Sequence, residues 1–275
     1  MIESLASRTS MNDGLEIPWL GLGVYLTEAG SQTQQAVHHA LEAGYRHIDT
    51  AMFYGNERDV GIAVRNSGLP REEIFVTTKL WNSDHGYQRT LDACNESLRA
   101  LDLGYIDLYL IHWPVEQLRG ESWRALIELQ QAGKCRSIGV SNYTIRHLRE
   151  LLRDSSVVPA VNQVEFSPFL FQSELLEFCR EHGILLEAYS SLTRGKKFSH
   201  PTIAALAKKY HKTPAQILIR WTLQHAVVVI PKSVHRERIL ENADIYDFDI
   251  SSADMAELDA LDENFRLSWD PTNAP

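Results

Sequence analysis

Short runs of apolar and β-branched residues alternate along this chain with longer stretches of helical periodicity. In the helical stretches apolar residues recur three and four positions apart, the pattern of a helix with one buried face. Clear examples are QTQQAVHHALEAG (32–44), GYQRTLDACNESLRALDLG (86–104) and SELLEFCREHG (173–183). All three end in Gly, which often terminates a helix. Thr213, Pro214 and Gln216 predict another helix start, with Thr213 as N-cap and Gln216 reaching back to it.

Eight apolar runs have the composition of buried strands. They are LGLGVY (20–25), YRHID (45–49), IFVTTKL (74–80), YIDLYLIH (105–112), CRSIGVS (135–141), AVNQVEF (160–166), ILLEAY (184–189) and VVVIPK (227–232). Eight successive strand-then-helix units predict an α/β fold with a closed parallel barrel, the (β/α)8 or TIM barrel. The longest spacing between strand ends contains an extra helical stretch around 201–210.

We expect residues 1–275 to form a single domain, because no linker, low-complexity tract or charge block interrupts the pattern. This length is ordinary for one α/β barrel. Near the N-terminus, MNDGLE followed by IPWLGLG predicts a β-hairpin that closes the barrel floor.

Composition and charge narrow the classes of function. The formal net charge of −9 argues against nucleic-acid and anionic-membrane partners, which need clustered Lys and Arg. No run approaches the length of a membrane span, and MIESLASRTSMNDG lacks the apolar core of a signal peptide. Cys94, Cys135 and Cys179 are widely spaced, as expected for small apolar residues in a reducing compartment. We expect a cytoplasmic monomer that acts on a small molecule without a metal.

Ionisable residues end three successive predicted strands, namely Asp49, Lys79 and His112, and Tyr54 follows Asp49 in the next loop. The carboxyl ends of barrel strands meet at one face, so these four side chains are expected to converge. Taken singly, each residue has an ordinary structural explanation. An Asp at a strand end often caps a turn, a Lys there usually extends into solvent, and a Tyr or His is commonly half buried at the barrel rim. An acid, an ammonium, a phenol and an imidazole together indicate catalysis.

The chemistry expected of this group is proton donation. A phenol has a pKa near ~10, and an ammonium ~4 Å away at an effective dielectric of ~20 lowers it by at most about three units. Asp49 would keep Lys79 charged in a dry pocket, and His112 would orient the substrate oxygen or relay the proton. Such a donor suits delivery of hydride to a carbonyl.

Seven segments in order resemble the signatures of the aldo-keto reductase family, from about residue 15 to 265. They are GYRHIDTAMFYGNE, TTKLW, YIDLYLIHWP, SIGVSNY, NQVEFSPF, AYSSL and IPKSV, the last followed by ERILEN. The resemblance implies a TIM barrel and NADPH-dependent reduction of aldehydes or ketones to alcohols. It also implies a catalytic tetrad of Asp49, Tyr54, Lys79 and His112, with Tyr54 as the general acid. The chain most resembles compact members such as diketogluconate reductases and protozoan prostaglandin F synthases.

Two segments are candidates for the cofactor site. Gly21 and Gly23 do not make a Rossmann fingerprint, because position 26 is Leu and no helix follows at once. Lys232 lies just before a predicted helix and Arg238 lies on it, so the two predict a small anion site. The alternative interpretation is a basic turn exposed to solvent. By resemblance these two grip the 2′-phosphate, which predicts NADPH over NADH.

The remaining cofactor residues are assigned by their position at strand ends and by the resemblance. Ser141, Asn142 and Gln163 have the donors and acceptors that a carboxamide needs, and Tyr189 offers a ring face to the nicotinamide. The alternative interpretation is that the three polar residues belong to turns and that Tyr189 is an aromatic residue of the core. The rest of the predicted set is Gly23, Val24, Tyr25, Asp49, Ser190, Leu192, Ser233, Val234, Glu241 and Asn242. Two departures from the family pattern, Ser191 in AYSSL and His235 after KSV, leave the strength of the phosphate contacts open.

Tyr25, Trp81, His112 and Trp113 are expected to wall the substrate pocket, although rim aromatics are equally often packing residues. The short segments 114–121 and 191–199 and the brief C-terminal tail indicate an open pocket that accepts many carbonyl compounds. One alternative is a non-catalytic NADPH-binding subunit. The other is a metal-dependent barrel hydrolase, which lacks support because His38 and His39 lie in a helical pattern.

Overall fold

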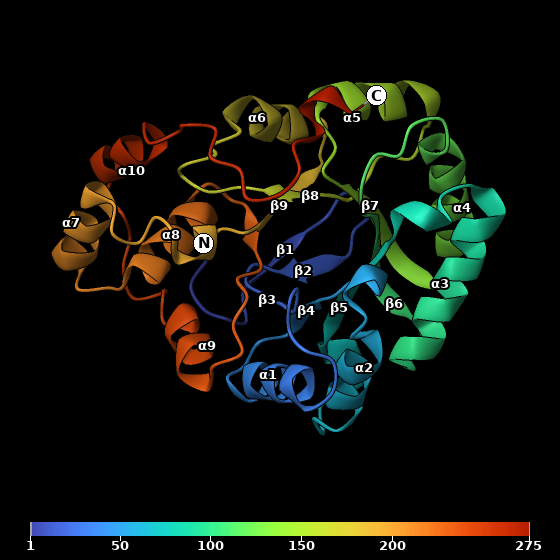
Figure 1. Ribbon diagram of the computed structural model, residues 1–275, viewed down its shortest axis with the longest axis horizontal. Helices are drawn as coiled ribbons and strands as arrows, with labels where there is room; N and C mark the ends of the chain where they lie inside the picture. Colours follow the sequence, from blue (N-terminus) through green and yellow to red (C-terminus); the bar gives the residue numbers. More distant parts are fainter. Residues whose placement is uncertain (1, 275) are drawn as a thin grey trace.

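An eight-stranded parallel sheet curled into a barrel forms the centre of the molecule (Figure 1), in a computed structural model that describes residues 2–274. The strands are β3 (Leu22–Gly23), β4 (His47–Asp49), β5 (Phe75–Leu80), β6 (Ile106–Ile111), β7 (Cys135–Ser141), β8 (Val161–Glu165), β9 (Leu185–Tyr189) and β10 (Val228–Val229). They follow one another in the sheet in chain order, and parallel bridges from Leu20 to Val229 and from Gly23 to Lys232 join its two edges. The predicted TIM barrel is confirmed.

The first and last barrel strands are shorter than their apolar runs predict. Only two residues form a regular ladder in each of β3 and β10, and single bridges complete the pairing between them. Pro231 explains part of this difference, because it lacks an N–H and contributes only its carbonyl oxygen, which accepts from Gly23 N.

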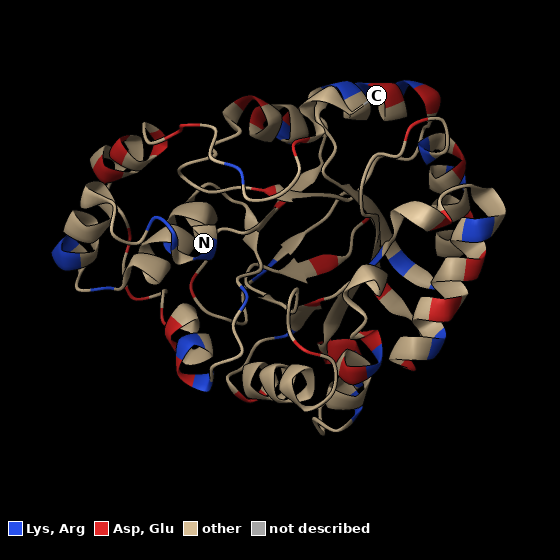
Figure 2. Cartoon of the chain, viewed as in Figure 1, with Lys and Arg blue, Asp and Glu red and all other residues tan. Residues whose placement is uncertain are grey.

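Helices surround the barrel and carry most of the charge, with both signs interspersed (Figure 2). They are α1 (Ser31–Glu42), α2 (Glu57–Arg65), α3 (Tyr87–Leu101), α4 (Arg119–Gln131), α5 (Ile145–Asp154), α6 (Ser173–Glu181), α7 (Pro201–Tyr210), α8 (Pro214–Gln224), α9 (Arg236–Ala243) and α10 (Ser252–Asp259). The extra stretch predicted around 201–210 is α7. Within residues 2–274, none of the helices has the length and apolar character needed to cross a membrane.

The predicted start of α8 is also present. Thr213 Oγ1 accepts from the backbone N–H of Gln216, and the side chain of Gln216 accepts from Thr213 N at 2.9 Å. With Pro214 at the first helical position, these contacts satisfy N–H groups that have no partner within the helix.

An antiparallel hairpin of β1 (Arg8–Ser10) and β2 (Glu16–Pro18) closes the amino-terminal end of the barrel, as predicted. Its Met11 and Ile17 are buried against residues at the starts of barrel strands, among them Phe75, Val161 and Val228. The hairpin begins earlier than the sequence pattern suggests, because residues 20–23 of IPWLGLG belong to the barrel itself.

Gly61 lets α2 and α3 approach closely. A Cβ added at Gly61 would lie 1.9 Å from the backbone carbonyl oxygen of Leu101, an atom that also accepts from Arg65 at 2.7 Å. Neither backbone can move without disturbing its own helix, so only Gly fits here.

We predict that Gly61→Ala lowers the free energy of unfolding by about 1–3 kcal/mol, because the methyl group forces the two helices apart. Denaturant unfolding measures the loss. Gly120→Ala is the matched control, because a Cβ at this helical position meets nothing within 4 Å. Equal stabilities for the two variants would contradict the close contact.

Candidate active site

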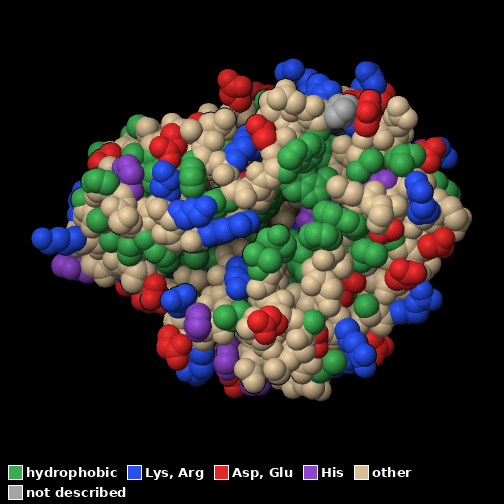
Figure 3. Space-filling model, viewed as in Figure 1, with side chains coloured by type: hydrophobic (Ala, Val, Ile, Leu, Met, Phe, Trp, Pro, Cys, Tyr) green, Lys and Arg blue, Asp and Glu red, His purple; other side chains and the backbone are tan. Residues whose placement is uncertain are grey.

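The carboxyl ends of the strands surround a cavity of about 750 Å³. Of the sequence-predicted residues, those that line it are Gly23, Tyr25, Asp49, Tyr54, Trp81, His112, Trp113, Ser141, Asn142, Gln163, Tyr189, Ser190, Leu192 and Lys232. Figure 3 shows the hollow with basic side chains on one rim and hydrophobic side chains on the other. The barrel therefore brings together residues that are up to about two hundred positions apart in the sequence.

Lys79 and Asp49 form a buried ion pair at the floor of this cavity. The Lys79 Nζ lies 2.7 and 2.8 Å from the two carboxylate oxygens and 2.8 Å from the carbonyl oxygen of Thr50. All three N–H groups of the ammonium thus have acceptors, although Lys79 is 0% and Asp49 only 2% exposed. Burial raises the pKa of Asp49, and the Lys79 charge opposes that rise.

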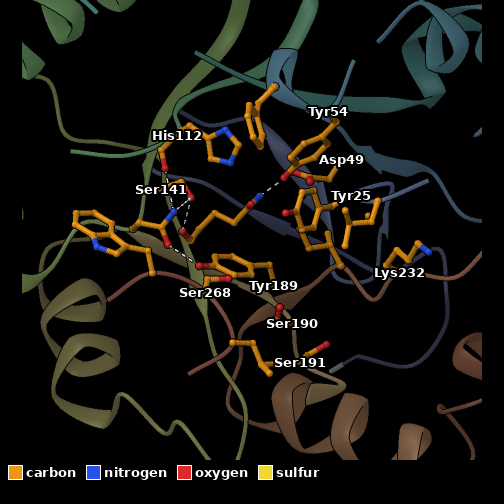
Figure 4. Close-up of a pocket in the computed structure, with 18 of the residues that line it drawn as sticks. Tyr25, Asp49, Tyr54, His112, Ser141, Tyr189, Ser190, Ser191, Lys232 and Ser268 are labelled. Atoms are coloured by element: carbon orange, nitrogen blue, oxygen red, sulfur yellow. Dashed lines mark hydrogen bonds between the residues drawn. The ribbon is translucent and has the colours of Figure 1, made fainter. Parts of the chain in front are cut away.

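Tyr54 is the last residue of the short 3-10 helix η1 (Met52–Tyr54), and its ring lies next to the Lys79–Asp49 pair. The Lys79 Nζ lies 5.1 Å from the centre of its ring, which packs between Tyr25 and His112. Within residues 2–274 its hydroxyl has no hydrogen-bond partner, and it faces the cavity (Figure 4).

Tyr54 does not have the lowered pKa that the sequence analysis expects. Burial first, and the Asp49 carboxylate second, raise the pKa of Tyr54 well above its usual range. Burial and the Asp49 charge outweigh any pull from Lys79, whose N–H groups all point to Asp49 and Thr50. The phenol therefore remains protonated at neutral pH.

His112 lies beside Tyr54, with the ring centres 5.7 Å apart. Burial, followed by the Lys79 charge, holds its pKa well below the usual range, so the imidazole is neutral. Its Nδ1 is buried without a hydrogen-bond partner in the described chain. A buried N–H without an acceptor is costly, which favours the tautomer with the proton on Nε2.

A hydrogen-bonded row links the ends of β7, β8 and β9 under the cavity. Ser141 Oγ donates to the carbonyl oxygen of Gln163, and Tyr189 Oη donates to Asn142 Oδ1. Asn142 adopts a positive φ of 62°, which Asn tolerates better than most residues, and its Nδ2 donates to His112 O. These contacts leave the Tyr189 ring at the cavity wall (Figure 4), which Gln163 also lines.

Glu187 and His47, both fully buried, lie in a second polar layer that sequence analysis did not identify. The Gln163 Nε2 donates to Glu187 and to Asp49, each at 2.8 Å. His47 Nε2 lies 3.6 Å from Glu187 Oε1. A glutamate inside the apolar run ILLEAY was an available signal, because a buried carboxylate needs a partner.

On the basic rim, Lys232 is exposed and has no ion pair or hydrogen bond in the part of the chain described. Burial of part of its stem lowers its pKa. Arg194, which sequence analysis did not propose, also lines the cavity, from a loop with a positive φ of 51°. Figure 4 places Lys232 on the side of the cavity opposite His112.

Six predicted cofactor residues lie outside the cavity lining. Val24 is fully buried in the core, and Ser233 makes a tight turn by bonding to the backbone of His235. Glu241 already accepts from Thr213 Oγ1 at 2.7 Å. The others are Val234, the exposed Arg238 and the buried Asn242, which lie before or on α9. Because Val24 belongs to the buried core cluster and does not line the cavity, its side chain packs away from the site.

Aromatic side chains form the outer wall of the cavity. Trp81 stacks on Phe53 at 3.8 Å, and Trp113 meets Trp269 at 5.3 Å. Trp269, Leu267 and Ser268 belong to the C-terminal segment, which crosses the barrel mouth in Figure 1.

Glu165 holds this segment in place. Its carboxylate accepts from the backbone N–H groups of Leu267 and Ser268 at 2.8 and 3.1 Å. The tail was expected to leave the pocket open. Instead it supplies one wall, a contact that local sequence patterns do not reveal.

Comparisons with known proteins agree with this geometry. The Aldo/keto reductase family model matches residues 20–263. Over 271 residues, the chain is 48% identical to the glyoxal reductase of Bacillus subtilis, covering 98% of both chains. It is 46% identical over 265 residues to the methylglyoxal reductase DkgA of Escherichia coli, covering 95% of both. The solved structure of a Bombyx mori aldo-keto reductase in complex with NADP superposes with a TM-score of 0.90 at 37% identity, covering 96% of this chain and 95% of that one. This chain belongs to the aldo/keto reductase family.

Proposed function

We propose that the protein reduces small aldehydes and dicarbonyl compounds such as glyoxal and methylglyoxal to alcohols, with NADPH as the reductant and Tyr54 as the proton donor. The observation that carries this proposal is the buried Lys79–Asp49 pair beneath a neutral phenol that faces the cavity. The names of the Bacillus subtilis and Escherichia coli relatives support the substrate class.

Tyr54 is suited to protonate an oxygen that gains negative charge. Its raised pKa keeps the proton on the phenol at neutral pH, so every molecule is ready to donate. When bound, the nicotinamide supplies the hydride. A carbonyl oxygen that becomes an alkoxide is a stronger base than phenolate, so transfer of the Tyr54 proton to it is favourable.

His112 orients the substrate in this scheme. As a neutral imidazole with its proton on Nε2, it donates a hydrogen bond to the carbonyl oxygen without competing as the acid. Asn142 accepts a hydrogen bond from Tyr189 and donates one to the backbone carbonyl oxygen of His112. These bonds hold the backbone of His112, and with it the imidazole, in place.

The residues present fit NADPH at both ends of the cavity. Ser141, Asn142 and Gln163 offer a polar edge for a carboxamide, and the ring of Tyr189 offers a face for the nicotinamide. At the other end Lys232 is a cation without a partner, and Arg238 on α9 is exposed without one among residues 2–274. Unpaired cations favour a 2′-phosphate over a ribose hydroxyl.

Two further inferences complete the proposal. The cavity is lined by residues from several strands spread along the chain, which supports one single-domain unit. Its three cysteines are free and buried, which supports a reducing compartment such as the cytoplasm.

Substituting Tyr54→Phe is expected to lower kcat by about 10²–10⁴-fold, because it removes the proton donor and keeps the ring. The Kd for NADPH, measured by fluorescence quenching, is expected to change little. Tyr25→Phe is the matched control, since it removes a second phenol hydroxyl from the same cavity and is expected to cost less than about tenfold. Near-parental turnover of Tyr54→Phe would show that another group donates the proton.

Replacing Lys232→Ala, alone and with Arg238→Ala, is expected to raise the Kd for NADPH about 10–100-fold while that for NADH stays within about threefold. The reason is loss of charge-assisted bonds to the 2′-phosphate. Lys196→Ala is the control, because Lys196 is an exposed lysine of a nearby loop that does not line the cavity. Equal losses for the two cofactors would contradict the assignment.

A further inference from the structure

Gln163 and Glu187 lie directly opposite each other where β8 pairs with β9. The Gln163 Nε2 uses its two hydrogens on two carboxyl groups, donating to Asp49 Oδ2 and to Glu187 Oε2 at 2.8 Å each. All three side chains are at most 2% exposed. Water therefore does not substitute for either contact.

An amide has two chemically different ends, and this arrangement permits only one orientation. If the Gln163 amide were turned over, its carbonyl oxygen would face two carboxyl groups and both would lose a donor. With the N–H groups held toward the barrel core, the carbonyl oxygen is left for the cavity, which Gln163 lines. One N–H of the Gln163 amide is bound by Asp49, and the other is bound by Glu187.

We propose that Glu187 is a positioning residue that fixes the Gln163 amide with its oxygen toward the cavity, where it accepts from the carboxamide of the nicotinamide. The inference rests on the proposed NADPH site. It assigns to Glu187 a role in cofactor affinity without contact between Glu187 and the cofactor.

His47 completes this second layer beneath the tetrad. Its Nε2 lies between Thr77 Oγ1 at 3.1 Å and Glu187 Oε1 at 3.6 Å. A Cβ at Gly21 would lie 2.6 Å from His47 Nδ1, so Gly21 leaves room for the imidazole. Glu187 Oε1 has no hydrogen-bond partner within residues 2–274, which leaves it facing His47.

The layer is neutral at neutral pH. Burial first, and the Asp49 charge second, raise the pKa of Glu187 to about 8. Burial, followed by Lys79, lowers the pKa of His47 to about 3. The charged or titratable groups around Glu187 are Asp49 and His47 from β4, Lys79 from β5 and Tyr54 from η1. Strand β8 contributes the neutral Gln163 amide, and β10 places the apolar Val228 opposite Glu187. The layer thus orients Gln163 without adding a charge to the Lys79–Asp49 pair.

Two substitutions separate orientation from packing. Glu187→Gln keeps an oxygen that accepts from Gln163, whereas Glu187→Met keeps the volume and removes the acceptor. We expect the Kd for NADPH to rise about tenfold in Glu187→Met and to stay within about threefold of the parent in Glu187→Gln. Fluorescence titration with NADPH measures both, and the melting temperature shows that each variant is folded.

The nucleotide-free protein provides a second readout, the side-chain amide signals of Gln163 in NMR spectra. We expect two slowly exchanging amide hydrogens in the parent and in Glu187→Gln, and fast exchange of one in Glu187→Met. If the proposed function fails, NADPH does not bind to the parent, yet this amide pattern is still expected. Parental NADPH affinity and an unchanged amide pattern in folded Glu187→Met would overturn the role of Glu187.

The pH dependence of stability gives a third test, which remains if Glu187→Met does not fold. The folded state holds the Glu187 proton up to about pH 8, whereas the unfolded chain releases it near the ordinary glutamate value of about 4.3. The parent must therefore lose stability relative to Glu187→Gln as pH rises from about 5 to about 8, and no further above it. A constant difference in melting temperature across that range would contradict a buried, neutral Glu187.

Discussion

Everything in the active site depends on a pair of opposite charges removed from water. Taking an ammonium and a carboxylate out of water costs several kcal/mol each, and the cost is offset only when their mutual attraction and hydrogen bonds are nearly complete. Lys79 meets that condition with two bonds to Asp49 and one to Thr50. The barrel provides the necessary positions, because adjacent parallel strands β4 and β5 end at the same face. The pair in turn restricts what can lie around it.

The groups above and below the pair are neutral chiefly because they are buried, and the charges of the pair add to that effect. His112 and His47 both have lowered pKa values, with Lys79 as the second cause after burial. Tyr54 and Glu187 both have raised pKa values, with Asp49 as the second cause. Each neighbour therefore keeps its uncharged form at neutral pH. Burial and the ion pair together thus leave a protonated phenol, a neutral imidazole and a hydrogen-bonded amide around the cavity.

The sequence predicts the parts of this site that depend on strand periodicity. Asp49, Lys79 and His112 converge because each lies at or next to the carboxyl end of a strand. The cap at Thr213 could be predicted from local residue types alone. The sign of the pKa shift at Tyr54 was not predicted, because it depends on how completely the fold buries the phenol and on the Asp49 charge beside it.

Other features depend on contacts across the fold and were not predicted. Trp269 lines the cavity on a segment whose two preceding N–H groups donate to Glu165, about a hundred residues earlier in the chain. Arg194 lines the cavity through a turn with positive φ that its residue types do not signal. Glu187 carried a signal, a lone carboxylate in an apolar strand, but its partner across β8 and β9 appears only once the strands are paired.

The central claim is that Lys79 and Asp49 act as one unit, and a double-mutant cycle of unfolding free energies tests it most directly. Asp49→Asn and Lys79→Met should each cost about 3–5 kcal/mol, since each leaves a buried charge without its counter-ion. The double variant should cost clearly less than the sum of the two. Additive losses, measured by denaturant unfolding, would contradict the account.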